Sequence, residues 1–179
     1  DEMEEKREFF GSILFQKRQR KGINKYESLK LMRTQNYFGA MMVETGEADA
    51  MLSGLTRNYA EGIRPAVQII GTEEGVKKIA GMYLLLTKKG PLFLAATTVN
   101  IKPTAEEIAD ITLMVAKEVR NFNIEPRIAM LSYSNFGSSD TPEARLVAEA
   151  SKIVKQKNPS LIVDGEMQGM LAFNKDILK

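Results

Sequence analysis

The chain contains neither cysteine nor histidine among its 179 residues. Without cysteine it can form no disulfide bond and no thiolate metal site, and it has no cysteine nucleophile. Without histidine it lacks the most common general base and the most common metal ligand. The sequence therefore predicts no metal site in this chain, and a large part of catalytic chemistry is excluded.

A strong excess of charge is also missing, because 25 basic residues face 23 acidic ones and the net charge is +2. Such a balance creates no broad field that would attract nucleic acid or an anionic membrane, so any anion site must be local. No apolar run approaches the roughly 20 residues that a membrane-spanning helix requires. The acidic start is the opposite of the basic first region of a signal peptide. We therefore expect a cytoplasmic protein that binds neither nucleic acid nor membranes.

What is present is an ordinary globular composition, with 44% hydrophobic and 27% charged residues. A chain of this length can form one large domain or two small lobes. It begins at Asp1 rather than Met, so we expect a piece of a longer polypeptide.

The first part of the sequence is mostly helical in pattern. Apolar residues at helical spacing predict helices ending near residues 19, 32 and 43. The short apolar segment 48–52 predicts a buried strand, and Thr56 is a candidate cap for a helix that continues to Ile70. Residues 71–75 combine glycine with polar residues and predict a hinge. We therefore expect a first, incomplete lobe over residues 1–75 and a second lobe over residues 76–179.

The second part alternates apolar strands with amphipathic helices. A hairpin is expected over residues 82–99, and further strands over residues 128–131 and 161–163. Thr104 with Glu107 forms a capping box before a long helix, and Thr141 with Pro142 opens another helix. Unbroken apolar strands between such helices are typical of a parallel sheet covered on both faces. The predicted fold class is α/β.

In open α/β sheets, ligands bind beyond the carboxyl ends of the strands. The polar loop 132–140, which includes Gly137, could hold a phosphate or carboxylate before a helix N-terminus, or it could be only a well-capped connection. Asp164 and Glu166 follow the last strand. One of them could act as an acid or base, or Asp164 could cap a helix that starts at Glu166.

Two arginines are candidate anion ligands. Arg64 is flanked by apolar residues, and a guanidinium near buried surface needs an anionic partner, which could be an internal carboxylate or a ligand phosphate. Arg18 lies in a basic run that could hold phosphates or could be a solvated helix end.

Seven ordered strings resemble the phosphate acetyl/butyryl transferase family over essentially the whole chain. They are KRQRKG (17–22), NYFGAMM (36–42), ADAMLSGLTRNY (48–59), IRPAVQIIG (63–71), GPLFLAATTVN (90–100), RIAMLSYSNFGSS (127–139) and VDGEMQ (163–168). Within that family, LTRNY and LSYSNFGS resemble the phosphotransacetylase-like domain that is fused to bacterial malic enzymes more than they resemble free-standing phosphotransacetylases.

This resemblance implies a two-lobed, three-layer α/β fold of the phosphotransacetylase and isocitrate-dehydrogenase-like type, truncated at its C-terminus. A cleft between the lobes would receive CoA and acetyl phosphate. The family's cleft arginines match Arg18 and Arg64, and the implied ligand contacts further include Thr56, Arg57, Ser132, Ser134 and Gly137. The family's catalytic Ser-Arg pair and Asp would lie downstream of VDGEMQ, so no catalytic residue is expected in this chain.

The resemblance also implies a function. The expected role is that of a regulatory domain that binds acetyl-CoA, in a homo-oligomeric malic enzyme whose N-terminal catalytic domains use NADP and a divalent metal to convert malate to pyruvate. One alternative is an active phosphate acetyltransferase. Another is an oligomerisation domain that binds no ligand.

Overall fold

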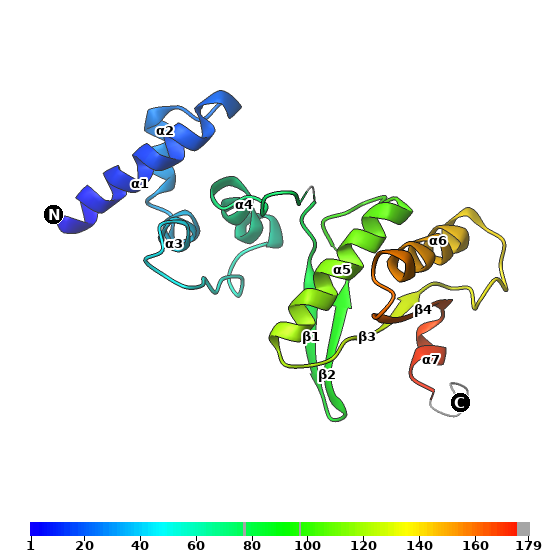
Figure 1. Ribbon diagram of the computed structural model, residues 1–179. Helices are drawn as coiled ribbons and strands as arrows, with labels where there is room; N and C mark the ends of the chain where they lie inside the picture. Colours follow the sequence, from blue (N-terminus) through cyan, green and yellow to red (C-terminus); the bar gives the residue numbers. More distant parts are fainter. Residues whose placement is uncertain (77, 97, 175–179) are drawn as a thin grey trace. The chain divides into compact units, whose positions relative to one another are not determined.

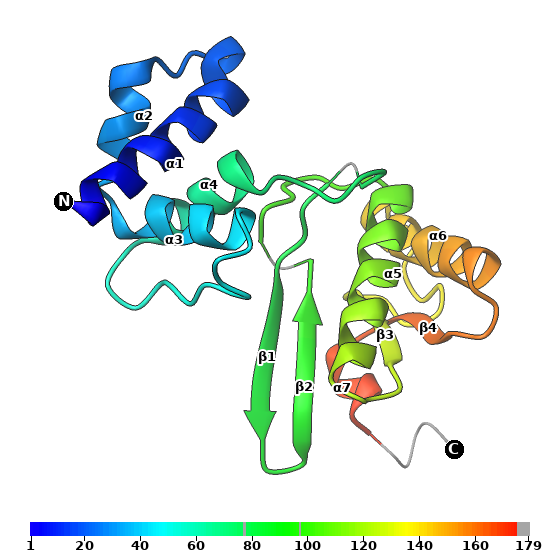
Figure 2. The same cartoon turned by 60° about the vertical axis from the view of Figure 1, so that its left-hand side comes forward.

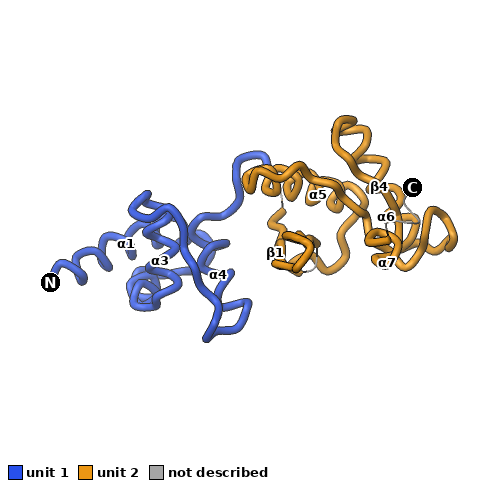
Figure 3. Tube along the Cα trace, turned by 90° about the horizontal axis from the view of Figure 1, so that it is seen from below, with its two compact units in different colours: residues 1–77 blue, residues 78–179 orange. Residues whose placement is uncertain are grey.

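The computed structural model describes residues 1–76, 78–96 and 98–174 (Figure 1). The chain divides into two compact units, Asp1–Lys77 and Lys78–Lys179, which Figure 3 colours separately. This division lies two residues beyond the boundary expected from the sequence.

Every regular element in the described part of unit 1 is a helix. These are α1 (Glu2–Arg18), the short 3-10 helix η1 (Gln19–Lys21), α2 (Lys25–Leu31), α3 (Gln35–Glu44) and α4 (Tyr59–Ile69). Asp1 caps α1 by accepting a hydrogen bond from the N–H of Met3. Acidic residues fill the first turn of α1 and basic residues its last turn, which suits the helix dipole.

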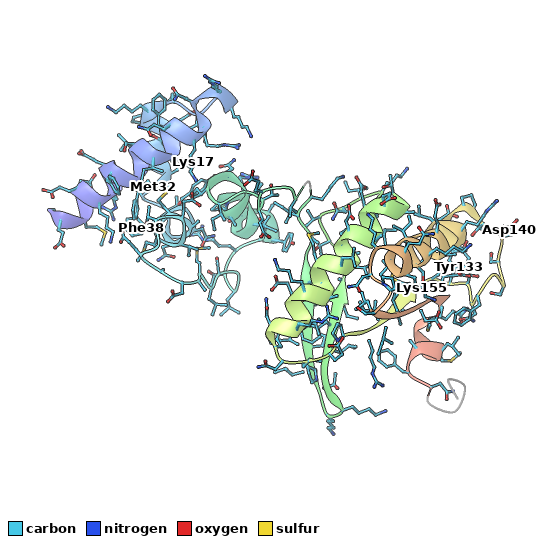
Figure 4. All side chains as sticks on the ribbon, in the orientation of Figure 1. Lys17, Met32, Phe38, Tyr133, Asp140 and Lys155 are labelled. Carbon is cyan, nitrogen blue, oxygen red and sulfur yellow. The ribbon has the colours of Figure 1, made fainter. Side chains whose placement is uncertain are left out.

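An apolar core joins the helices of unit 1. Its buried members are Phe10, Leu14, Met32, Tyr37, Ala40, Met41 and Ile69. Gly11 allows α2 to approach α1 closely, since a Cβ at this position would lie 2.7 Å from Cδ2 of Leu29. The ring of Phe38 lies 5.1 Å from that of Phe10, and both Phe38 and Met32 are labelled in Figure 4. Burial of these side chains is the main source of stability for unit 1.

Two expectations for unit 1 are wrong. Residues 48–52 form no strand, and the Leu52 side chain is fully exposed, because the described part of unit 1 offers no strand for this segment to pair with. Helix α4 begins at Tyr59, and its cap is Asn58 rather than Thr56. The Asn58 side chain accepts a hydrogen bond from the N–H of Glu61, at 2.9 Å.

Unit 2 contains strands and helices in turn. They are β1 (Met82–Thr87), β2 (Gly90–Ala95), α5 (Ala105–Asn121), β3 (Arg127–Leu131), α6 (Pro142–Lys157), β4 (Ile162–Met167) and α7 (Gly169–Ala172). Strands β1 and β2 form an antiparallel hairpin, which Figure 2 shows along its length. Gly90 closes its turn at a φ of +114°, a conformation that glycine adopts without strain.

The core of unit 2 lies between α5, α6 and the parallel pair β3 and β4. Its buried members are Ala105, Ala109, Ala116, Met130, Ala150, Val154, Leu161 and Val163. The expected capping box of Thr104 and Glu107 is present at the start of α5, and Thr141 caps α6 as expected. Lys157 joins the two helices through ion pairs with Glu106 and Asp110.

The expected hairpin and the expected parallel strands are both present, and the α/β class is confirmed. Within the described residues, however, they form two separate two-stranded sheets rather than one sheet. An apolar run indicates a strand but not its neighbour, which explains the difference. Asp164 caps no helix, because it lies within β4 and α7 begins only at Gly169.

Candidate functional site

The two candidate arginines lie within electrostatic reach of one tyrosine in unit 1. Arg18 ends α1 and Arg64 lies in α4, while Tyr37 lies in α3. Burial raises the pKa of the Tyr37 phenol, and the positive charges of Arg64 and Arg18 act in the opposite direction. Two cationic side chains from distant parts of the sequence therefore act on the same phenol.

Neither arginine has a carboxylate partner among the described residues. Arg64 is exposed, and Arg18 is half-buried with its Nε atom buried and without a hydrogen-bond acceptor. By contrast, the neighbouring Lys17 is fully engaged, since its Nζ pairs with the Glu44 carboxylate and donates to the carbonyl of Ile69. The Nε of Arg7 and the hydroxyl of Ser151 are likewise buried without a hydrogen-bond partner among the described residues.

The other two residues of unit 1 that were predicted to contact a ligand lie beside a surface hollow of about 510 Å³. Thr56 and Arg57 line it, together with Asn36 of α3 and the irregular segment 51–55. Both predicted residues are exposed, and Arg57 lies 3.9 Å from the Glu61 carboxylate. Arg57 is therefore partly neutralised from within the chain, unlike Arg18 and Arg64.

The predicted residues of unit 2 lie in the loop between β3 and α6. Gly137 is exposed with a φ of +85°, and Ser132 is half-buried. Ser134 is fully buried, and its hydroxyl donates to Oε1 of Glu166 at 3.0 Å and accepts from the N–H of Ser139. In the structure, Ser134 stabilises the conformation of this loop.

Glu166 is the anchor of this loop. Its carboxylate is only 3% exposed and also accepts the Gly137 N–H, at 2.6 Å. This hydrogen bond, with smaller contributions from the Glu166 backbone and the Ser134 hydroxyl, keeps the pKa of the Glu166 carboxyl below its usual value in spite of burial. An ionised acceptor suits a structural anchor better than a general acid. The neighbouring Asp164 is exposed and pairs with Lys155, which is labelled in Figure 4.

Arg18 and Arg64 thus both influence one phenol electrostatically, and Ser132, Ser134 and Gly137 lie together in one loop of unit 2. Sequence reasoning missed Tyr37 and its hydrogen-bond partner Gln68. A signal was present, since Gln68 follows Arg64 by one helical turn. Within the described ranges, no three acidic side chains gather in a way that could hold a metal ion, and no helix there is long and apolar enough to cross a membrane.

The fold as a whole is that of solved phosphotransacetylases. A phosphotransacetylase from Streptococcus pyogenes superimposes with a TM-score of 0.80 at 34% sequence identity, over 98% of this chain and 53% of that one. The model of the family described as "Phosphate acetyl/butaryl transferase" matches residues 1–179. The chain belongs to this family.

Its curated relatives fall into two classes. The chain is 43% identical to an NADP-dependent malic enzyme of Escherichia coli (strain K12), over 87% of this chain and 21% of that protein. It is 42% identical to a phosphate acetyltransferase of Bacillus subtilis (strain 168), over 82% of this chain and 46% of that protein. The chain therefore spans about a fifth of the malic enzyme and under half of the acetyltransferase.

Proposed function

We propose that this chain binds the phosphate groups of acetyl-CoA through Arg18 and Arg64, as a regulatory domain of a malic enzyme. The observation that carries the proposal is that two guanidinium groups, from α1 and α4, both influence the Tyr37 phenol electrostatically and have no carboxylate partner among the described residues. The oxygens of a phosphate group would accept charge-assisted hydrogen bonds from such guanidinium groups.

The family and the malic-enzyme relatives support a wider role for the chain. The N-terminal catalytic domains of the same polypeptide would carry NADP, a divalent metal and the conversion of malate to pyruvate, and the whole would form a homo-oligomer in the cytoplasm. Acetyl-CoA bound here would then adjust the activity of those domains. Thr56 and Arg57 of unit 1 and Ser132 and Gly137 of unit 2 are further proposed ligand contacts, and Ser134 supports the loop of Ser132 and Gly137 from within.

The principal alternative is an active phosphate acetyltransferase. Its support is the 42% identity to the Bacillus subtilis enzyme, which differs little from the identity to the malic enzyme. In that case the arginines would orient phosphate or CoA for attack on the acetyl group, with the catalytic residues supplied by sequence beyond this chain.

Binding is tested by isothermal titration of acetyl-CoA into the full chain and its Arg64→Ala variant. We expect the variant to bind more weakly by about 1 to 3 kcal/mol, the scale of one hydrogen bond to a charged group. Lys30→Ala is the matched control, because Lys30 is an exposed cation of α2 in the same unit. Unchanged affinity in Arg64→Ala, or an equal loss in both variants, would refute the site.

The two functions are separated by turnover in the full-length polypeptide. Acetyl-CoA and inorganic phosphate are supplied, and acetyl phosphate is measured together with the malic enzyme rate. Binding that changes the malate reaction without forming acetyl phosphate supports the regulatory domain. Acetyl phosphate formation that is lost in Arg64→Ala supports the transferase.

A further inference from the structure

Three helices of unit 1 have their C-terminal ends at one ammonium group. Lys17 belongs to the last turn of α1, and its Nζ pairs with the carboxylate of Glu44, the last residue of α3. The same Nζ donates a hydrogen bond of 3.0 Å to the carbonyl of Ile69, the last residue of α4. One side chain of the basic run therefore contacts both of the other helices directly.

Electrostatics favours a cation at this point. The last carbonyl groups of a helix have no partner within the helix, and the aligned peptide dipoles add about half a negative charge at that end. The carboxylate of Glu44 contributes a full negative charge. Lys17 satisfies one free carbonyl of α4 and balances the carboxylate, so its ammonium group is strongly held in place.

The position of Lys17 matters for its neighbour. Arg18 is the next residue of α1 and is half-buried, and Arg64 lies on α4, five residues before Ile69. We infer that Lys17 is a positioning residue, which fixes the last turn of α1, and with it Arg18, on the helix that carries Arg64. This inference rests on the proposed function of the arginines.

A direct role of Lys17 in binding the ligand is the alternative. An ammonium group has three donors, and two of those of Lys17 are used by acceptors within the chain. An anion that approached Lys17 would also have to compete with the Glu44 carboxylate. The contacts therefore favour a structural use of Lys17 and leave the neighbouring guanidinium for the ligand.

The first experiment replaces Lys17 in the full chain, with coenzyme A titrated calorimetrically well below the melting temperature of each variant. Lys17→Met removes both contacts and keeps the length of the side chain. Binding should weaken about ten-fold, the value of one hydrogen bond to a charged group, because a displaced Arg18 no longer makes its contact well. Lys17→Arg keeps the charge and the N–H donors and should restore most of the affinity.

The second experiment separates positioning from charge by the direction of the effect. Glu44→Gln makes the chain more positive by one charge and frees Lys17 from its carboxylate. If Lys17 bound the ligand itself, or acted only through its charge, the affinity for coenzyme A would rise. A positioning role predicts the opposite, about five-fold weaker binding, since an ion pair becomes a weaker hydrogen bond.

Glu47→Gln is the matched control for this variant. Glu47 pairs with Lys6, nearer to the start of α1, so the substitution adds the same charge and breaks an ion pair of the same helix without touching Lys17. Its affinity for coenzyme A should equal or exceed that of the unmodified chain.

Each outcome decides a different point. Equal or tighter binding by Glu44→Gln refutes the positioning role, and this variant carries the test alone if Lys17→Met does not fold. A Lys17→Met chain that melts earlier but binds normally while folded has lost only stability, which also refutes the role. In both cases a loss of affinity in Arg18→Ala and Arg64→Ala would leave the proposed function intact. If those two variants bind coenzyme A normally, the proposed function fails and this inference fails with it.

Discussion

Glu166→Gln tests how the loop between β3 and α6 is held. The carboxylate accepts hydrogen bonds from the Gly137 N–H and from the Ser134 hydroxyl, at 2.6 and 3.0 Å. Glutamine has the same shape and can still accept both bonds, but without a charge. Each bond then drops from about 1.5–3 to about 0.5–1.5 kcal/mol, so the loop should lose about 2 kcal/mol of stability.

The loss should depend on pH in a defined direction. The Gly137 N–H, more than any other group, holds the folded-state pKa of Glu166 below 4.5. A lowered folded pKa gives a stabilising contribution that is complete above the unfolded value and is lost as the pH falls through the folded value. The difference between the two proteins should therefore be full at neutral pH and should shrink in acid, where Glu166 becomes protonated.

Hydrogen exchange at the Gly137 amide is the appropriate assay, because two units need not unfold together. A loss of about 2 kcal/mol corresponds to exchange about 30-fold faster in Glu166→Gln at neutral pH. Glu149→Gln, an exposed residue of α6, provides the control. Equal protection of Gly137 in all three proteins at neutral pH, or a difference that persists unchanged in acid, would refute the reasoning.

Two further predictions concern stability. Gly11→Ala places a Cβ against α2 and should cost about 1–3 kcal/mol, whereas Gly62→Ala in α4 meets no atom within 4 Å and should gain up to about 1 kcal/mol. Thermal unfolding of both variants followed by circular dichroism checks this, and equal shifts would contradict it. Asn58→Ala should cost about 1 kcal/mol as the loss of a helix cap, while Thr56→Ala should change stability by less than about 0.5 kcal/mol. Urea unfolding that ranks these two variants in the reverse order would show that the cap is misassigned.

The elements that the sequence predicted well carry their own local signals. Thr104 and Glu107 hydrogen-bond across one helical turn, and Thr141 caps the helix that Pro142 opens. Asn58 with Glu61 has the same three-residue spacing, so the start of α4 was also readable, although Thr56 was chosen. Such contacts span a few residues and need no knowledge of the fold.

The errors have non-local causes. Residues 48–52 are apolar enough for a strand, but a strand needs a partner, and the described part of unit 1 contains only helices. The pairing of β1 with β2 was readable as a hairpin, but that this hairpin and the pair β3 and β4 form separate sheets was not, because apolar runs carry no information on pairing.

The residues of the candidate site were also predictable from local patterns, whereas their contacts were not. The basic run around Arg18 and the apolar residues that flank Arg64 made both arginines candidates. No local pattern linked them to Tyr37. The hydrogen bond from Tyr37 to Gln68 spans 31 positions. The serines of the polar loop were readable as hydroxyl donors, but only coordinates could reveal that Ser134 is buried against Glu166. The chemical type of each candidate side chain could therefore be read from the sequence, but which side chains lie near one another could not.

The hydrogen bond from Lys17, which is labelled in Figure 4, to the Ile69 carbonyl joins positions 52 apart and ties the end of α1 to the end of α4. Arg18 is the next residue, so the hydrogen bond that holds α1 against α4 also fixes the position of one of the two arginines. Shortening the polypeptide from its front by twenty residues would remove Phe10 and Leu14 from the interior together with Arg18. In this truncated polypeptide, anion affinity and cooperative folding of these helices should accordingly be lost together.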